Sequence, residues 1–309
     1  MENDLWDRRD ESDDEGGDDE GEPLLLDDVG LDELDPYRVD ADAAGGPGAG
    51  GAQLHDAALL APRLSTVDAA ESALKGDREA AARFAEGLAA QGRGDATDAA
   101  NGYQAVVGRL PALAPAHNNL GAALLALGDA DGAITAYCHA LHLDPQNPDA
   151  RYNLGLAYAR HGQADEAVDQ FRLLVAARPD DATAHFHLGD ALAQTGDLAA
   201  AKDAYEAALA LDPMLLDARH HLALALEQQD DTLGAQIQWQ RVVADRPDLP
   251  DAHLNLARLL ALDGATAEAA LDHLRRALDL DPSLNASLDD PAFDTLRADP
   301  AFASLTPRP

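Results

Sequence analysis

The stretch APAHNNLGAALLALGDADGAITAYCHALHLDPQN, residues 114–147, carries the pattern that decides the fold. Apolar residues recur at spacings of three and four on both sides of Gly128 and Asp129, which predicts two amphipathic helices joined by a tight turn. Small residues such as Gly121 stand where the two helices must approach closely, and Pro145 ends the second helix. The stretch therefore predicts a helical hairpin.

The same pattern returns about every 34 residues, which indicates a repeat protein rather than one isolated hairpin. A Leu-Gly or Leu-Ala pair marks the first helix of each copy, at residues 120–121, 154–155, 188–189, 222–223 and 256–257. A bulky core residue marks the second helix: Tyr137, Phe171, Tyr205, Trp239 and Leu274. A closing proline follows each copy: Pro145, Pro179, Pro213, Pro247 and Pro282. A fainter copy with Gly87 and Tyr103 in register precedes them, so we expect six units.

This pattern resembles that of the tetratricopeptide repeat (TPR) family, in its prokaryotic form, over residues 80–284. The resemblance implies an all-α fold, a right-handed TPR superhelix, which is an α-solenoid of helix-turn-helix units. It implies protein binding as the function, although a shared fold does not identify the partner. His117, Arg151, His185, Arg219 and His253 stand where the family often has tryptophan, and we expect them to form a polar rim.

Four segments are expected along the chain. They are a disordered acidic tail (1–53), N-terminal lead helices (54–79), the repeats (80–284) and a C-terminal cap (285–309). The six units are placed at 80–113, 114–147, 148–181, 182–215, 216–249 and 250–284. The lead helices, interrupted at Pro62 and restarting at Ser65-Thr66, and the cap should cover the apolar ends that have no neighbouring repeat.

The tail interrupts its acidic residues with one apolar island, residues 21–39. Three interpretations are open: a solvated tail with incidental leucines, a short motif that folds on a partner, or a segment that docks in the protein's own groove. High charge with little to bury predicts disorder for the remainder.

The formal net charge of −35 disfavours nucleic acid or an anionic membrane surface as a direct partner. No run of eighteen apolar residues predicts a membrane span, and the first residues lack a secretory signal, so we expect a cytoplasmic protein without membrane insertion. The acidity fits either a GC-rich genome with an acidic tail or a salt-loving host. Cys138, the only cysteine, is expected to be a packed core thiol without a disulfide partner.

By family resemblance, the sixth residue of each unit points into the concave groove. These residues are Asn119, Asn153, His187, His221 and Asn255. Each can both donate and accept a hydrogen bond, so a ladder of them could clamp a peptide backbone without reading its sequence. The alternative is that these residues only pack neighbouring repeats together. Further groove candidates are Arg160, Asp190, Gln194, Gln228 and Arg258, whereas Tyr152, Phe186 and His220 are expected to pack at helix contacts.

We expect no catalysis, no metal and no cofactor. At most His187, His221 and Asp190 converge, which makes a poor zinc site, and no nucleotide, hydrolase or metalloprotease motif occurs. The favoured function is a non-catalytic scaffold or adaptor that binds a peptide segment of another protein in the groove. The alternatives are a self-assembling structural protein and a regulator whose acidic tail, around Leu24 to Leu34, is active or autoinhibitory.

Overall fold

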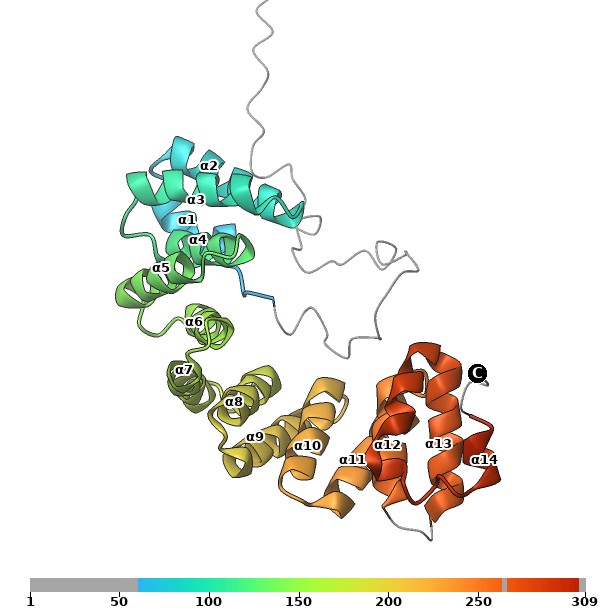
Figure 1. Cartoon of the computed structure of the whole chain (residues 1–309). Helices are drawn as coiled ribbons and strands as arrows, with labels where there is room; N and C mark the ends of the chain where they lie inside the picture. The colour runs from blue at the N-terminus through green and yellow to red at the C-terminus, as the bar shows by residue number, and fades with distance from the viewer. Residues whose placement is uncertain (1–60, 263–265, 306–309) are drawn as a thin grey trace, which may run out of the picture. The chain divides into compact units, whose positions relative to one another are not determined.

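The computed structural model describes residues 61–262 and 266–305, and every regular element in those ranges is a helix. A short helix, α1 (Val67–Leu74), precedes six consecutive helix pairs. The pairs are α2 (Arg78–Gly92) with α3 (Ala96–Arg109), α4 (Ala114–Ala126) with α5 (Ala130–Leu143), α6 (Pro148–Arg160) with α7 (Ala164–Ala177), α8 (Ala182–Thr195) with α9 (Leu198–Leu211), α10 (Leu216–Gln228) with α11 (Thr232–Asp245), and α12 (Pro250–Ala261) with α13 (Ala267–Leu280). Figure 1 shows these pairs following one another in chain order.

Each helix packs against the helix before it and the helix after it, so the described residues form an all-α solenoid. We call the first helix of each pair the A helix and the second the B helix. Inside a pair, the turn needs a left-handed residue: Gly128 has φ +82°, and the equivalent residues Gly94, Gly162 and Gly196 are also left-handed. Asp230 takes this conformation in the α10–α11 turn, at φ 60°. The glycine in most of these turns is therefore explained by the left-handed backbone conformation that the turn requires.

The two helices of a pair meet where a glycine of the A helix faces an aromatic ring of the B helix. A Cβ added to Gly121 would lie 2.7 Å from Tyr137, and one added to Gly155 would lie 2.8 Å from Phe171. These rings are almost completely buried, and so is Trp239, which stands in the pair whose A helix carries Ala223. The repeated small and aromatic residues thus set the distance between the paired helices.

The five residues expected to form a polar rim have a different role. Each places a side-chain nitrogen on the carbonyl oxygen of the proline six residues earlier, in the loop that enters its A helix. The pairs are His117 with Pro111, Arg151 with Pro145, His185 with Pro179, Arg219 with Pro213 and His253 with Pro247. His117, Arg219 and His253 are buried. These residues satisfy loop carbonyls between successive repeats, and the three buried ones do not stand at a rim.

The C-terminal segment folds as η4 (Pro282–Asp289), η5 (Pro291–Phe293) and α14 (Pro300–Ala303). Leu288, Phe293, Leu296 and Phe302 are buried in the same core as the last helix pair. Thr295 Oγ1 donates to the carbonyl of Ala261 over 2.7 Å, which ties this segment to α12. The apolar end of the last repeat is thereby covered.

At the other end, α1 buries Ala70 and Leu74 in a common core with Phe84 of α2. Residues 61–66, expected within the lead helices, contain no helix. Their main chain instead hydrogen-bonds to side chains of α4 and α6. The acidic tail, the island at 21–39 and the start of the lead segment lie outside the described residues.

Cys138 is exposed, so the expected core thiol is wrong. The buried position is that of its neighbour Tyr137, and successive residues of a helix point in different directions. In the described ranges, no helix is long and apolar enough to cross a membrane.

Candidate functional site

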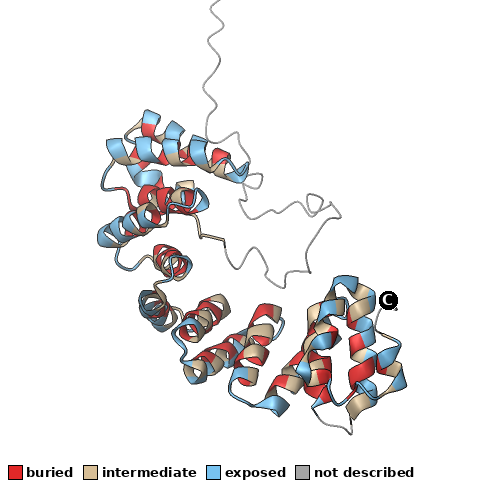
Figure 2. Cartoon of the chain, viewed as in Figure 1, coloured by how far each residue is buried: buried red, intermediate tan, exposed pale blue. Residues whose placement is uncertain are grey.

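Residues 61–66 run across α4 and α6 and reach the first two rungs of the predicted ladder. This segment is the short blue stretch that leads into α1 in Figure 1. We call the register positions of Asn119, Asn153, His187, His221 and Asn255, and the surface around them, the ladder face. On α4, residues 114, 116–123 and 125 are buried, and Figure 2 shows this burial along most of the helix. Part of the cover comes from residues 61–66 and α1.

Asn119 pairs with the main chain of Ser65 at two points. Its Oδ1 accepts from the Ser65 N–H over 2.7 Å, and its Nδ2 donates to the Ser65 carbonyl over 2.9 Å. Asn153 repeats the arrangement on Arg63, with 2.6 Å from the Arg63 N–H to Oδ1 and 2.7 Å from Nδ2 to the Arg63 carbonyl. Residues 63 and 65 are alternate residues, which present their main-chain groups on one side of an extended chain.

Asn118, next to the first rung, joins the two rungs. Its Nδ2 donates to the Arg63 carbonyl over 3.0 Å and to Ser65 Oγ over 3.1 Å. Its Oδ1 accepts from Asn153 Nδ2 over 2.9 Å. Asn118, Asn119 and Asn153 are all fully buried, so their amides depend on these partners for hydrogen bonding.

The Arg63 side chain extends from α6 to the start of α8. Its Nη1 and Nη2 donate to the two carboxylate oxygens of Asp181 over 2.9 and 3.3 Å, a bidentate pair. The guanidinium lies over the Tyr152 ring, 4.0 Å from its centroid, in cation–π geometry. Asp149, which lies on α6 like Tyr152, places its Oδ1 3.9 Å from Arg63 Nη1. One planar cation is thus held by two carboxylates and an aromatic face.

Charge pairing outweighs burial at this contact. Burial opposes ionisation of Asp181, but the hydrogen bond and charge of Arg63 hold the pKa of that carboxyl below its ordinary value. Burial also opposes the charge of Arg63, and the Asp181 contacts nevertheless raise the pKa of the guanidinium. Asp181 also caps α8 by accepting from the Ala184 N–H over 3.0 Å, so the helix start fixes its position.

The next two rungs are connected to this site and to each other. Tyr152 Oη lies 3.1 Å from His187 Nε2. Asp190 Oδ2 lies 3.8 Å from His187 Nδ1, and Asp190 Oδ1 lies 2.5 Å from His221 Nδ1. Asp190 Oδ1 also accepts a hydrogen bond from Tyr205 Oη over 2.8 Å. Tyr152, predicted only as packing, is buried, and it also contacts Arg63 and His187. The rungs on α6, α8 and α10 therefore share one polar network.

Burial opposes the charged forms of His221 and Asp190, but their mutual hydrogen bond is stronger. The pKa of His221 is raised above its ordinary value and that of Asp190 is well below its own, so the contact favours the charged form of both side chains. Among the described residues, no group of three or more His, Cys, Asp or Glu has metal-binding geometry. His187 and His221 instead both lie within contact distance of the Asp190 carboxylate.

The remaining predicted site residues are not part of this network. Asn255 Oδ1 accepts from Arg258 over 3.3 Å, and Arg258 pairs with Asp290 of the C-terminal segment over 2.9 Å. Arg160, Gln194 and Gln228 are exposed near the C-terminal ends of α6, α8 and α10. The structure thus brings together the rungs from α4 to α10, and it places the fifth rung beside the cap.

Sequence reasoning missed the segment 61–66 and its partners Asn118, Asp149 and Asp181. Asp181 stands where a helix N-cap is expected, and that role alone explains an aspartate there, so the sequence does not indicate its contact with Arg63. Pro62 was the available signal, because a proline and the residue before it favour extended backbone over helix. Nothing in the sequence indicated which surface that extended stretch would cover.

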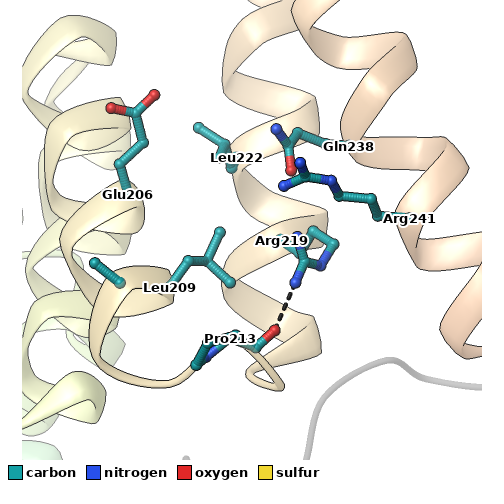
Figure 3. Close-up of a pocket in the computed structure, with 8 residues that line it drawn as sticks. Glu206, Leu209, Pro213, Arg219, Leu222, Gln238 and Arg241 are labelled. Carbon is teal, nitrogen blue, oxygen red and sulfur yellow. Dashed lines mark hydrogen bonds between the residues drawn. The ribbon is translucent and has the colours of Figure 1, made fainter.

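A separate pocket of about 330 Å³ lies between α9, α10 and α11. Figure 3 shows Arg219 donating to the Pro213 carbonyl at its base, with Glu206 and Arg241 at its sides. None of the predicted site residues lines it. Arg219 in its wall therefore stabilises the α9–α10 loop, which is a structural role.

The repeat is also identified by comparison with known families. A model described as TPR repeat matches residues 121–162, and one described as tetratricopeptide repeat matches residues 152–214 and 220–285. The chain belongs to the tetratricopeptide repeat family. Comparison with curated proteins finds no match.

Solved TPR structures resemble this TPR protein over part of its length. A crystal structure of MamA matches with a TM-score of 0.51 and 26% identity, covering 53% of this chain and 95% of that chain. The MamA fragment 41-end from Desulfovibrio magneticus RS-1 matches with a TM-score of 0.53 and 25% identity, over 55% of this chain and 96% of that one. YrrB, described as a TPR protein with an unusual peptide-binding site, matches with a TM-score of 0.52 and 23% identity, over 61% and 98%. The likeness to YrrB concerns the fold.

Proposed function

We propose that this TPR protein is a non-catalytic scaffold that binds an extended segment of a partner protein across the ladder face. The observation that supports this most directly is the two-point pairing of Asn119 and Asn153 with the main chain of residues 65 and 63. A surface that binds one stretch of polypeptide in this way has the geometry to bind another.

The pairing recognises main-chain groups. Every residue except proline offers one N–H and one carbonyl, and a carboxamide side chain matches both at once. Because the two rungs engage alternate residues, the face favours an extended chain over a helix, whose main-chain groups are already paired. The proposed role is binding and not catalysis, because these amides satisfy main-chain hydrogen bonds and supply no nucleophile.

A protein partner also fits the charge. The chain carries a formal net charge of −35, and Asp149, Asp181 and Asp190 lie beside the rungs. Such a surface repels phosphate backbones and attracts cationic polypeptide.

Fluorescence anisotropy with a labelled Ala-Pro-Arg-Leu-Ser-Thr peptide tests the proposal. The protein is the full chain with Arg63→Asp, which places a carboxylate beside Asp149 and Asp181 and so loosens its own segment. We expect the peptide to bind, and we expect the further pair Asn119→Ala and Asn153→Ala to weaken binding about tenfold or more, because several hydrogen bonds are lost. Replacing the exposed amides of Asn101 and Gln104 on α3 by alanine is the matched control.

The proposal is contradicted if binding is equal in the asparagine and control variants. Peptides methylated on the arginine and serine main-chain nitrogens add a second readout, because methylation removes the two N–H groups that the rungs accept from. Unchanged affinity for the methylated peptide would also contradict main-chain recognition.

A further inference from the structure

Residues 61–66 occupy the rungs that a partner segment would need. The segment immediately precedes α1, so it is held beside the ladder face by its own chain. A tethered segment competes at a high effective concentration, on the order of millimolar for a short flexible connection. Any partner that binds Asn119 and Asn153 must therefore displace it.

The contacts of Arg63 go beyond main-chain recognition. Asp181 receives two parallel hydrogen bonds at 2.9 and 3.3 Å, and the Tyr152 ring faces the guanidinium plane at 4.0 Å. A guanidinium has the planar fork for both contacts, whereas an ammonium group can make only a point contact with each. This position therefore selects arginine by shape as well as by charge.

Two residues later, the position of Ser65 favours a small side chain. Ser65 is 8% exposed, and its Oγ accepts from Asn118 Nδ2 over 3.1 Å. The neighbouring Asn118 and Asn119 side chains are fully buried, so a bulky residue here would have to push them out of their hydrogen bonds.

We infer that residues 61–66 are a self-ligand, and that a partner segment shares their chemistry: an extended stretch with arginine two residues before serine or another small residue, which binds by displacing them. The inference rests on the proposed function and adds side-chain selectivity and internal competition to it. The occupant is thus a basic segment of another protein, complementary to Asp149 and Asp181.

Selectivity is tested on the full chain carrying Arg63→Asp, with labelled hexapeptides that differ at one position. Relative to Ala-Pro-Arg-Leu-Ser-Thr, we expect alanine in place of arginine to weaken binding about tenfold, and lysine to weaken it about threefold or more. Tryptophan in place of serine should also weaken binding. Adding Asp181→Asn to the protein should reduce the difference between the arginine and alanine peptides.

Displacement is tested by comparing the wild-type chain with Arg63→Asp. We expect the arginine peptide to bind the variant at least about fivefold more tightly, because a competitor has been weakened. Arg83→Asp on α2, which changes the net charge equally at an exposed site, is the control and should behave like the wild type.

Failure of the inference is distinguishable from failure of the proposed function. If the alanine and arginine peptides bind equally while Asn119→Ala and Asn153→Ala still weaken binding, main-chain recognition stands and the inference is overturned. Equal affinity for the wild type and Arg63→Asp overturns internal competition. If no peptide binds any of these proteins, both the inference and the proposed function fail.

Discussion

Gly189 defines how closely the helices of one pair approach, since an added Cβ would lie 2.5 Å from a carbon of the Tyr205 ring. Tyr205 is buried and donates to Asp190, so its ring has little room to move. The same close approach recurs at Gly121 and Gly155. The conformational freedom of glycine is secondary here, because the absent side chain is what permits the packing.

We predict that Gly189→Ala lowers the free energy of unfolding by about 1–3 kcal/mol, because overpacking exceeds the roughly 1 kcal/mol that alanine adds in a helix. Gly108→Ala in α3 is the matched control. Its Cβ would meet nothing within 4 Å, so only the helical gain of about 0.5–1 kcal/mol applies. Urea denaturation followed by circular dichroism measures both. A stabilised Gly189→Ala protein would contradict the packing argument.

At the residue scale, the positions of the rungs could be read from the sequence, whereas their partners could not. Asn119 and Asn153 followed from the register of the repeat, because each directly precedes the Leu-Gly pair and so occupies the same place on its helix. Asn118 and Asp181 could not be found in this way. Their contacts depend on where residues 61–66 cross the helices, and no periodicity specifies that path.

At the scale of the helices, the B helices differ in how they begin. Asp95, Asp129, Asp197 and Asp231 each accept a hydrogen bond from a main-chain N–H in the first turn of their helix. The α7 helix begins with Gln163, whose side chain makes no such bond. A longer amide side chain fits this capping position poorly.

Gln163→Asp should therefore stabilise the protein by about 0.5–2 kcal/mol, the usual contribution of an N-cap. The equivalent loss, Asp197→Ala at the start of α9, should destabilise by a similar amount. Thermal unfolding followed by circular dichroism compares the two variants with the wild type. The account of the helix starts is wrong if Gln163→Asp unfolds earlier than the wild type.

Helix positions in the repeats were predictable because glycine, aspartate and proline recur at the same places in most units. The lead segment was predictable only in part. The helix start at Ser65 and Thr66 was close to the observed first residue, Val67. The six residues before it lack an amphipathic period of their own and are held by main-chain contacts to other helices, which a local pattern does not record.

At the scale of the whole described stack, the His221–Asp190 pair links α10 to α8, two A helices of successive repeats. Because the pKa of His221 is raised on folding above 6.5, the pair contributes its full stability below that pH. The contribution is lost as the pH rises through the raised value, when His221 loses its proton. Nearby Tyr205 stays neutral, because burial and the Asp190 charge raise its pKa.

The midpoint of thermal unfolding should consequently fall as the pH is raised from 6.5 into the alkaline range. His221→Asn removes the titrating group and should flatten that dependence. His142→Asn at an exposed position of α5 is the control and should retain the wild-type profile. A wild-type midpoint that rises over this range, or a slope unchanged by His221→Asn, would contradict the ionic pair.

The order of helix pairs also followed from the sequence, because each repeat contacts mainly its neighbours and no long-range topology had to be chosen. The sequence did not indicate that residues 61–66 would lie on the ladder face. Residues 63 and 153 are far apart in sequence, and their pairing depends on the assembled stack.

Amide hydrogen exchange at Arg63 and Ser65 in the full chain, followed by NMR, tests most directly whether Asn153 and Asn119 clamp a main chain. Both amides should be protected in the wild type. Asn153→Ala should speed exchange mainly at Arg63 and Asn119→Ala mainly at Ser65, each by about tenfold or more. Rapid exchange of both amides in the wild type, or protection that neither substitution changes, would contradict the account.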